Sequence, residues 1–314
     1  MDLIKNFTLT NLHGMQVTLS NYGARILSIK VRNKSNQLIE TTLNHQTDTE
    51  IKNDVFYMGA TCGRISNRLS KAQFSVGEKT IKLEANEGEN LLHGGKDSFS
   101  HRYWQVDELQ NNNEDSQIIF SLFSEDGDQG FPGNLNARVS YTLTKTNELR
   151  VDYWAQSDAL CPINMCNHTY FNLGATSIDE LKLSVKAKHY LPVDDNSIPT
   201  GEIRVLPPEL DLIKEQLLKQ KLKTLDFDHC YVLEKNMAFS ALLSSEEQGI
   251  AMLIKTDQEA LQVYSGNYLP QKHSAIALEA QGLVDAPNQA GFACDWVSPD
   301  NDYRKYVSYQ FIKY

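Results

Sequence analysis

Hydrophobic and polar residues alternate along much of this chain, and this period of two constrains the fold more than any other feature. Between residues 137 and 144 every second side chain is hydrophobic, and those between are Arg, Ser or Thr. Residues 181–188 and 27–32 repeat the pattern. Successive side chains of a strand point to opposite faces, so the pattern predicts strands with one buried and one solvated face, typical of antiparallel sheets. A polar break at residues 145–148 predicts a hairpin.

Turn signals such as Asn21-Tyr22-Gly23, Asp126-Gly127 and Pro132-Gly133 recur between the alternating segments. Many strands joined by such loops predict an all-β protein, a large antiparallel β-sandwich or barrel-like domain. Leucine and isoleucine fall near helical spacing in residues 208–223, which predicts a short amphipathic helix there. Because we find no internal repeat and no long linker, we expect residues 1–314 to form a single domain.

Charge and composition exclude several classes of partner. The 314 residues carry 40 acidic and 30 Lys or Arg side chains, a net charge of −10 that repels nucleic acid and anionic membranes. No segment approaches the roughly 20 apolar residues of a membrane span, and the start lacks the features of a secretory signal. The five cysteines form no CxxC pair. We therefore expect a cytoplasmic protein with reduced thiols.

Chemistry is expected in six short clusters that are rich in hydrogen-bonding groups. The signatures of phosphate loops, dinucleotide-binding folds, zinc proteases and serine hydrolases do not occur in the sequence. The clusters are GRISNR (63–68), NLLHGG (90–95), NHTYFNL (167–173), FDHCYVL (227–233), LQVYSGN (261–267) and ALEAQ (277–281).

Four titratable side chains in these clusters are candidates for proton transfer on a neutral polyhydroxy ligand. Glu279 interrupts an apolar strand, and a buried acid is rare unless it is paired or functional. His168 and His93 offer imidazoles suited to exchange protons near neutral pH. His168 is equally consistent with a structural core histidine, and Asp228 with a turn residue. No pair of these residues has the spacing of a metal site, so we expect neither metal nor cofactor.

The clusters, taken in order, resemble the aldose 1-epimerase family, the galactose mutarotases. The resemblance also includes NYGA (21–24), DGDQGFPGNL (126–135), PVDDNSIPTGEI (192–203) and the extension of the last cluster to LEAQGLVDAPN (278–288), so it spans nearly the whole chain. The sequence departs from the family pattern at Ala280, where proline is common, and in residues 208–223 and 289–296. These departures concern the rim of the pocket and the choice of sugar.

The resemblance implies an all-β fold, the galactose mutarotase-like supersandwich. It also implies a free aldohexose substrate such as D-galactose or D-glucose. We expect the protein to be a monomer or a homodimer. The resemblance further implies that His168 is the general acid and Glu279 the general base, with no cofactor. Glu279 would take the C1 hydroxyl proton while His168 protonates the ring oxygen, so activity should peak near neutral pH. The residues implied to bind the sugar are Asn67, Arg68, His93, Thr169, Tyr170, Asp228 and Gln262.

Three other functions stay open from the sequence. A sugar-phosphate epimerase of the same superfamily would need cations for the phosphate, which Arg64 and Arg68 would supply. A glycoside hydrolase would use Asp228 and Glu279 as its two carboxylates. A catalytically silent sugar-binding protein would keep the pocket without the chemistry.

Overall fold

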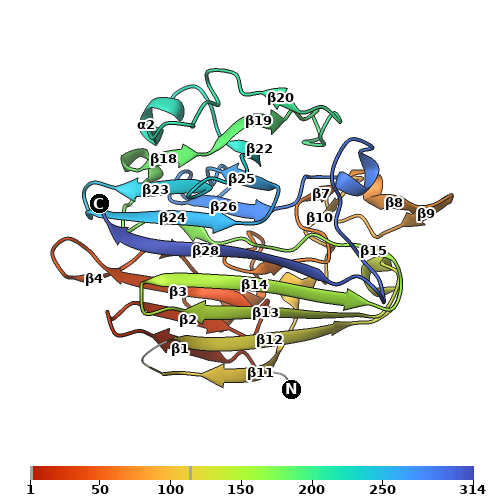
Figure 1. Cartoon of the computed structure of the whole chain (residues 1–314), viewed down its shortest axis with the longest axis horizontal. Helices are drawn as coiled ribbons and strands as arrows, with labels where there is room; N and C mark the ends of the chain where they lie inside the picture. The colour runs from red at the N-terminus through yellow and green to blue at the C-terminus, as the bar shows by residue number, and fades with distance from the viewer. Residues whose placement is uncertain (1–2, 113–114) are drawn as a thin grey trace.

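Antiparallel sheets dominate the structure, a computed structural model that describes residues 3–112 and 115–314 (Figure 1). The largest sheet has nine strands, and its order is β11 (Gln105–Gln110), β12 (Ser116–Ser124), β13 (Leu135–Leu143), β14 (Glu148–Ser157), β28 (Tyr303–Lys313), β24 (Ile250–Thr256), β23 (Ala241–Ser245), β18 (Lys182–Val185) and β21 (Gln216–Leu217). In the part of the chain described, no helix is long and apolar enough to cross a membrane.

Two further sheets lie behind this one in Figure 1. The seven-stranded sheet has the order β20 (Arg204–Val205), β19 (Ala187–Leu191), β22 (Asp228–Leu233), β25 (Ala260–Tyr264), β26 (Ile276–Gln281), β17 (Tyr170–Phe171) and β5 (Thr42–Leu43). The four-stranded sheet has the order β1 (Asn6–Thr10), β2 (Gln16–Ser20), β3 (Arg25–Arg32) and β4 (Leu38–Glu40).

Short elements complete the described structure. The two-stranded pairs are β7 (Arg68–Leu69) with β10 (Leu91–Leu92), β6 (Thr61–Cys62) with β16 (Cys166–Asn167), β8 (Gln73–Val76) with β9 (Lys79–Lys82), and β15 (Cys161–Pro162) with β27 (Trp296–Val297). The helices are α1 (Asp48–Lys52) and α2 (Leu218–Lys221), with 3₁₀ turns at Ser70–Ala72, Phe99–His101, Asp128–Gly130, Ile178–Glu180 and Ala286–Asn288.

The sheets bury a common core between them, as a β-sandwich does. Phe171 of the seven-stranded sheet and Tyr309 of the nine-stranded sheet meet with ring centroids 5.1 Å apart. Phe7 of the four-stranded sheet meets Phe120 of the nine-stranded sheet at 6.1 Å. The nine-stranded sheet therefore faces both smaller sheets, and the prediction of a large antiparallel β-sandwich is confirmed.

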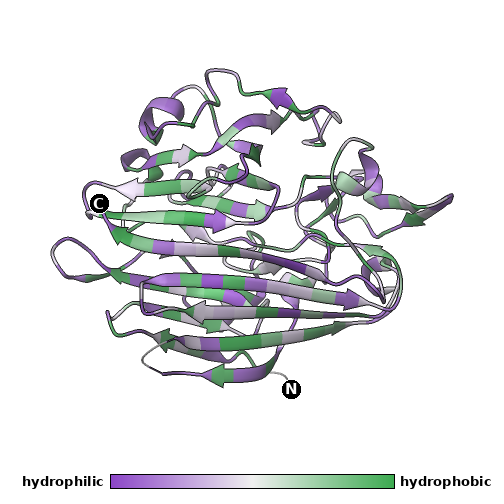
Figure 2. Cartoon of the chain, in the orientation of Figure 1, coloured by the Kyte–Doolittle hydropathy of each residue, from purple (hydrophilic) through white to green (hydrophobic). Residues whose placement is uncertain are grey.

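The alternation that predicted strands is visible in the exposure of β13. Its residues are buried at every second position, and hydrophobic and hydrophilic bands alternate along the strands of this sheet (Figure 2). The predicted hairpin at residues 145–148 is also confirmed, because β13 and β14 pair in antiparallel register on either side of it.

Two local predictions were wrong. Residues 181–188 are not one strand: the chain leaves the nine-stranded sheet after β18 and enters the seven-stranded sheet at β19. The helix expected over residues 208–223 shrinks to the single turn α2. The preceding backbone bonds to other elements instead, since Leu212 O accepts from Val185 N and Leu210 O from the Tyr231 hydroxyl. Pairing with neighbouring strands outweighs the local helical spacing.

A buried ion pair holds the turn that follows α1. Arg25 Nη1 lies 2.7 Å from Asp54 Oδ2, and both side chains are fully buried. Asp54 also accepts the backbone N–H groups of Phe56 and Met58, at 3.0 and 2.8 Å. Burial alone would raise the pKa of Asp54, but the hydrogen bond from His45 and the charge of Arg25 lower it to about 2. The ionised carboxylate thus fixes the backbone of this turn.

We predict that Asp54→Asn lowers the free energy of unfolding by about 3 kcal/mol, because it leaves the Arg25 charge buried without a counter-charge. The pKa of Asp54 is lower in the folded state than its ordinary 3.8, so its contribution is complete above pH 4 and is lost as the pH falls towards about 2. Urea unfolding at pH 7 measures the loss. Asp97→Asn, at an exposed ion pair, is the control and should cost less than about 1 kcal/mol. Equal stability of the two variants would contradict the assignment.

Candidate active site

A cavity of about 200 Å³ gathers most of the residues predicted to form the site. Eight of the nine predicted residues line it: Asn67, Arg68, His93, His168, Tyr170, Asp228, Gln262 and Glu279. The other lining residues are Val55, Phe56, Tyr57, Glu87, Leu92, Tyr264 and Tyr268. Thr169 does not line it, because its hydroxyl points to Asn167 Oδ1, 2.5 Å away.

Strand pairing in the seven-stranded sheet brings the two carboxylates to one face. Gln262 of β25 lies opposite Glu279 of β26, and Asp228 of β22 lies opposite Tyr264 of β25. Residues two apart on a strand share a face, so the three polar side chains project together. Gln262 Nε2 donates to Asp228 Oδ1 at 2.6 Å, which fixes the direction of the amide.

Glu279 and His168 form a buried acid–base pair at the cavity. His168 Nε2 lies 3.6 Å from Glu279 Oε1, and the two side chains are 6% and 3% exposed. Burial raises the pKa of Glu279 above its ordinary value, and the neighbouring His168 and a hydrogen bond from Cys166 oppose that rise. A carboxylate with a raised pKa is a stronger base when it is ionised. The pair therefore has the groups needed to take one proton and give another.

The backbone of His168 is tied to the turn that Asp54 holds. His168 N donates to Ala60 O, and His168 O accepts from Gly59 N, both at 2.9 Å. The imidazole lies against the rings of Tyr170 and His93, with centroids 4.8 and 5.4 Å away. These contacts fix the ring in one orientation, so its nitrogens have defined directions.

His93 is built to be a neutral hydrogen-bond donor. Its Nδ1 faces the backbone N–H of Asn67 at 3.2 Å and must accept there, which leaves the proton on Nε2. Burial lowers the pKa of His93 well below its ordinary value, and the charges of His168 and Arg68 lower it further. A neutral imidazole with Nε2–H donates to a ligand without exchanging protons with it.

The spacing of His93, His168 and Glu279 would admit a metal ion, since their ligating atoms lie within 4.8 Å of one another. A histidine that binds a metal through one nitrogen normally donates a hydrogen bond from the other. Nδ1 of His93 instead accepts one, so Nε2 keeps its proton and has no lone pair for a metal. The hydrogen bonding at His93 does not fit a metal site.

Arg68 is held by a neighbouring acid. Its Nε and Nη2 both donate to the Glu87 carboxylate at 2.8 Å. Asn67 Oδ1 accepts from the backbone N–H of Arg68, also at 2.8 Å. Asn67, His93 and Tyr57 all have left-handed backbone, with φ of 59°, 48° and 55°. Such strained residues cluster at functional sites because the surrounding structure must hold them.

Comparison with known proteins shows the family of this chain. A family model described as aldose 1-epimerase matches residues 5–310. The aldose 1-epimerase of Escherichia coli (strain K12) is 33% identical, with 97% of this chain and 94% of that protein covered. The galactose mutarotase of Sus scrofa is 33% identical, with 92% and 89% covered. The chain belongs to the aldose 1-epimerase family.

Solved structures agree with this membership. An aldose epimerase homologue from C. elegans has a TM-score of 0.93 to this chain at 27% identity, with 99% of both chains covered. The resemblance to the aldose 1-epimerase family read from the sequence is therefore confirmed. Like the named members of the family, the chain is an enzyme of the isomerase class.

Several cavity residues of this aldose 1-epimerase family member were missed in the sequence. Tyr57 packs on His93 with ring centroids 4.5 Å apart, and Tyr264 lies 6.1 Å from Tyr170. Tyr264 stands inside the LQVYSGN cluster, so its proximity to Gln262 was a usable signal. Tyr57 and Glu87 lie outside the polar clusters that drew attention. Only the three-dimensional fold brings them to the cavity.

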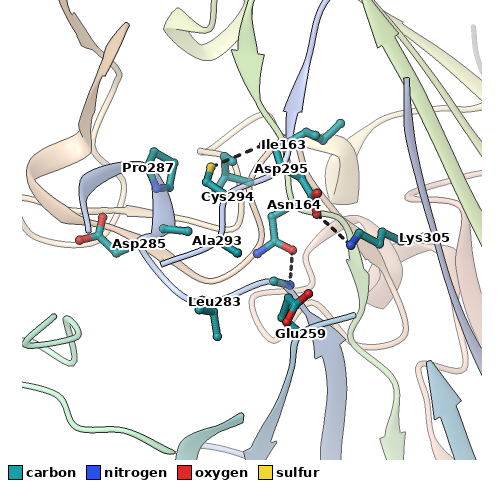
Figure 3. A pocket seen from close by; sticks show the side chains of 13 residues that line it. Ile163, Asn164, Glu259, Leu283, Asp285, Pro287, Ala293, Cys294, Asp295 and Lys305 are labelled. Carbon is teal, nitrogen blue, oxygen red and sulfur yellow. Dashed lines mark hydrogen bonds and ion pairs between the residues drawn. The ribbon is translucent and has the colours of Figure 1, made fainter. Parts of the chain in front are cut away.

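A second cavity of about 40 Å³ lies beyond the end of β26 and holds none of the predicted residues. Figure 3 shows contacts between some of its polar groups, whereas the Asp285 carboxylate points away from them. Asn164 Oδ1 accepts from Gly282 N at 2.8 Å, and Lys305 pairs with Asp295 at 3.3 Å. The bond to Asn164 ties the residue that follows β26, the strand that carries Glu279, to a neighbouring segment, which is a structural role.

We predict that the pKa of His93 lies well below the ordinary histidine value of 6.5, so that its ring is neutral with the proton on Nε2 at neutral pH, because burial and nearby cations disfavour a second proton. The measurement is a nitrogen-15 NMR titration of the histidine rings, with His93→Gln used to assign the signal. Protonation of His93 with a midpoint at or above the ordinary value of 6.5 would contradict the donor role.

Proposed function

We propose that this chain interconverts the α and β anomers of a free aldohexose such as D-galactose or D-glucose, with His168 as general acid and Glu279 as general base. The observation that carries the proposal is the 3.6 Å approach of His168 Nε2 to Glu279 Oε1 at a cavity lined by hydrogen-bonding side chains. Two groups of different acidity beside one small ligand are what the reaction needs. Membership of the aldose 1-epimerase family supports the same reaction.

The proposed reaction moves only protons on oxygen. Glu279 takes the proton of the C1 hydroxyl while His168 protonates the ring oxygen, and the C1–O5 bond breaks to give the open-chain aldehyde. Rotation about C1–C2 then presents the other face of the carbonyl. Reclosure returns a proton to His168 from the C5 hydroxyl and one from Glu279 to the new C1 hydroxyl. No electrons are exchanged with a cofactor.

The remaining predicted residues would hold the sugar hydroxyls. Asp228 offers carboxylate oxygens, and Asn67, His93 and Tyr170 offer neutral polar groups. Gln262 is oriented by its bond to Asp228. Thr169 belongs outside this set, because its hydroxyl is bonded to Asn167.

The charges of the cavity favour a neutral sugar over a sugar phosphate. Arg68 is the one Lys or Arg among the described lining residues, and the Glu87 carboxylate already binds its guanidinium at two atoms. The cation proposed earlier as a phosphate ligand, Arg64, instead donates to backbone oxygens of Ser124, Pro132 and Gly133 outside the cavity. Among the described lining residues, a phosphate would therefore meet no Lys or Arg that is free of an acidic partner.

A hydrolytic role for the two carboxylates is less well supported than epimerisation. Asp228 Oδ1 accepts a 2.6 Å hydrogen bond from Gln262, which suits a carboxylate that holds hydroxyls. The imidazole beside Glu279 would also have no task in a two-carboxylate mechanism.

We predict that Glu279→Gln lowers kcat by roughly 10²–10⁴-fold with a smaller change in KM, as expected for a lost general base. Polarimetry on freshly dissolved α-D-galactose measures the rate. Glu89→Gln, an exposed change on the loop before His93, is the control and should leave both constants unchanged within about twofold. A Glu279→Gln enzyme with more than half of the wild-type kcat would remove this residue from the mechanism.

Replacing His168 separates an epimerase from a binding protein with the same pocket. We predict that His168→Asn binds galactose within about tenfold of wild type, because it loses about one hydrogen bond. Its mutarotation rate should fall by roughly 10²-fold or more, because the asparagine amide cannot act as an acid near neutral pH.

The measurement pairs calorimetric affinity for galactose with polarimetric rates from pH 5 to pH 9. If affinity and rate fall in equal proportion, His168 only holds the sugar. If the wild-type protein binds galactose and never accelerates mutarotation, the binding-protein alternative stands.

A further inference from the structure

The carboxyl group of Glu279 has two oxygens in different surroundings. Oε1 faces His168 Nε2, whereas Oε2 lies 3.5 Å from the thiol sulfur of Cys166. Within residues 3–112 and 115–314, this thiol is the hydrogen-bond donor that the structure gives Glu279. The orientation of the base therefore depends on a cysteine that does not line the cavity.

Strand pairing fixes the position of the Cys166 thiol beside Glu279. Cys166 is fully buried in β16, where it pairs in register with Cys62 of β6. His168, two residues further along the same segment, lines the cavity. One short segment thus carries both His168, the proposed acid, and Cys166, which donates a hydrogen bond to the proposed base Glu279.

We propose that Cys166 is a positioning residue: its thiol holds Oε2 of Glu279 so that Oε1 is presented to His168 and the sugar, and as a weak donor it leaves the carboxylate strongly basic. This inference rests on the proposed function, because it concerns the base of that reaction.

The chemistry of a thiol explains why Cys166 can orient Glu279 and still leave its carboxylate strongly basic. Burial raises the pKa of the Cys166 thiol well above its ordinary value, so the sulfur keeps its proton and remains a donor. An S–H group is a weaker donor than a hydroxyl. A hydrogen bond to an ionised carboxylate lowers the carboxyl pKa in proportion to its strength. A weak donor therefore orients Glu279 at little cost in basicity.

Other groups near Glu279 also set its protonation. His168 and Arg68 favour the carboxylate, while Asp228 opposes it. His93, neutral through burial, adds no positive charge. The nearby hydroxyls and thiol of Tyr170, Tyr264, Tyr309 and Cys230 all have raised pKa values, so they stay protonated across the working range of pH. Substitution of Cys166 changes none of these charges.

The test is the pH dependence of kcat/KM for mutarotation in two Cys166 variants. The acid limb is the low-pH side of this profile, where the base becomes protonated. Cys166→Ala removes the donor, so this limb should move up by about half a pH unit. The kcat of this variant should fall roughly threefold to tenfold, with KM within about twofold of wild type. Cys166→Ser supplies a stronger donor of similar size, so its acid limb should move down while kcat stays within about threefold.

Cys161→Ala is the matched control, since Cys161 is equally buried and its thiol contacts Arg64 and Pro162 in the described structure instead of Glu279 or Cys166. Its acid limb should coincide with that of wild type. A purely structural role for Cys166 would lower stability in both variants without opposite shifts of the limb. Opposite shifts of the acid limb in Cys166→Ala and Cys166→Ser support the proposal. If one of these variants fails to fold, the direction in which the acid limb of the other moves decides.

The positioning role is overturned if the acid limbs of the two Cys166 variants do not move, if they move in the same direction, or if the limb of Cys161→Ala moves equally. In those cases an active wild-type enzyme leaves the proposed function intact. A wild-type enzyme without mutarotase activity overturns the proposed function itself.

Discussion

Removing a carboxylate from water costs several kcal/mol, and Glu279 is 2% exposed in the middle of β26. The fold offsets part of this cost because the imidazole of His168 and the thiol of Cys166 face the two oxygens of the carboxyl group. The same burial that costs stability raises the pKa of Glu279 and makes it a better base. Most features of the site serve to keep this one group buried, oriented and paired.

The residues that line the cavity come from two kinds of element: strands of a regular sheet and short irregular segments. Long antiparallel strands bury the core and fix β22, β25 and β26, which carry Asp228, Gln262 and Glu279. Short segments around residues 54–68 and 86–95 contribute Asn67, Arg68 and His93 to the cavity. Ion pairs help to hold these segments, in which Asn67 and His93 have strained backbone. The seven-stranded sheet is rigid, and the short segments facing it are held by many contacts. The hydrogen-bonding groups of the pocket are therefore oriented before a ligand binds.

Sequence reasoning reached the sheet architecture because alternation reports which face of a strand is buried, as β13 illustrates. It also singled out Glu279, since an acid in an apolar strand is unusual. It failed where tertiary pairing overrides local pattern, as at the change of sheet after β18 and in residues 208–223. It missed Tyr57 because no local pattern shows that a turn held by Asp54 will face the cavity. The hydroxyl of Thr169 was assigned to a sugar because its bond to Asn167 follows from backbone geometry that the sequence does not display.

The central claim is that the wild-type enzyme opens and recloses the ring by proton transfer on oxygen alone. Two-dimensional NMR exchange spectroscopy of D-galactose in D₂O tests it directly, with the uncatalysed buffer as reference. The account predicts α/β exchange cross-peaks that grow with enzyme concentration, undiminished C1 and C2 proton signals, and no new species. Exchange no faster than in buffer, or loss of the C2 proton signal through carbon deprotonation, would contradict it.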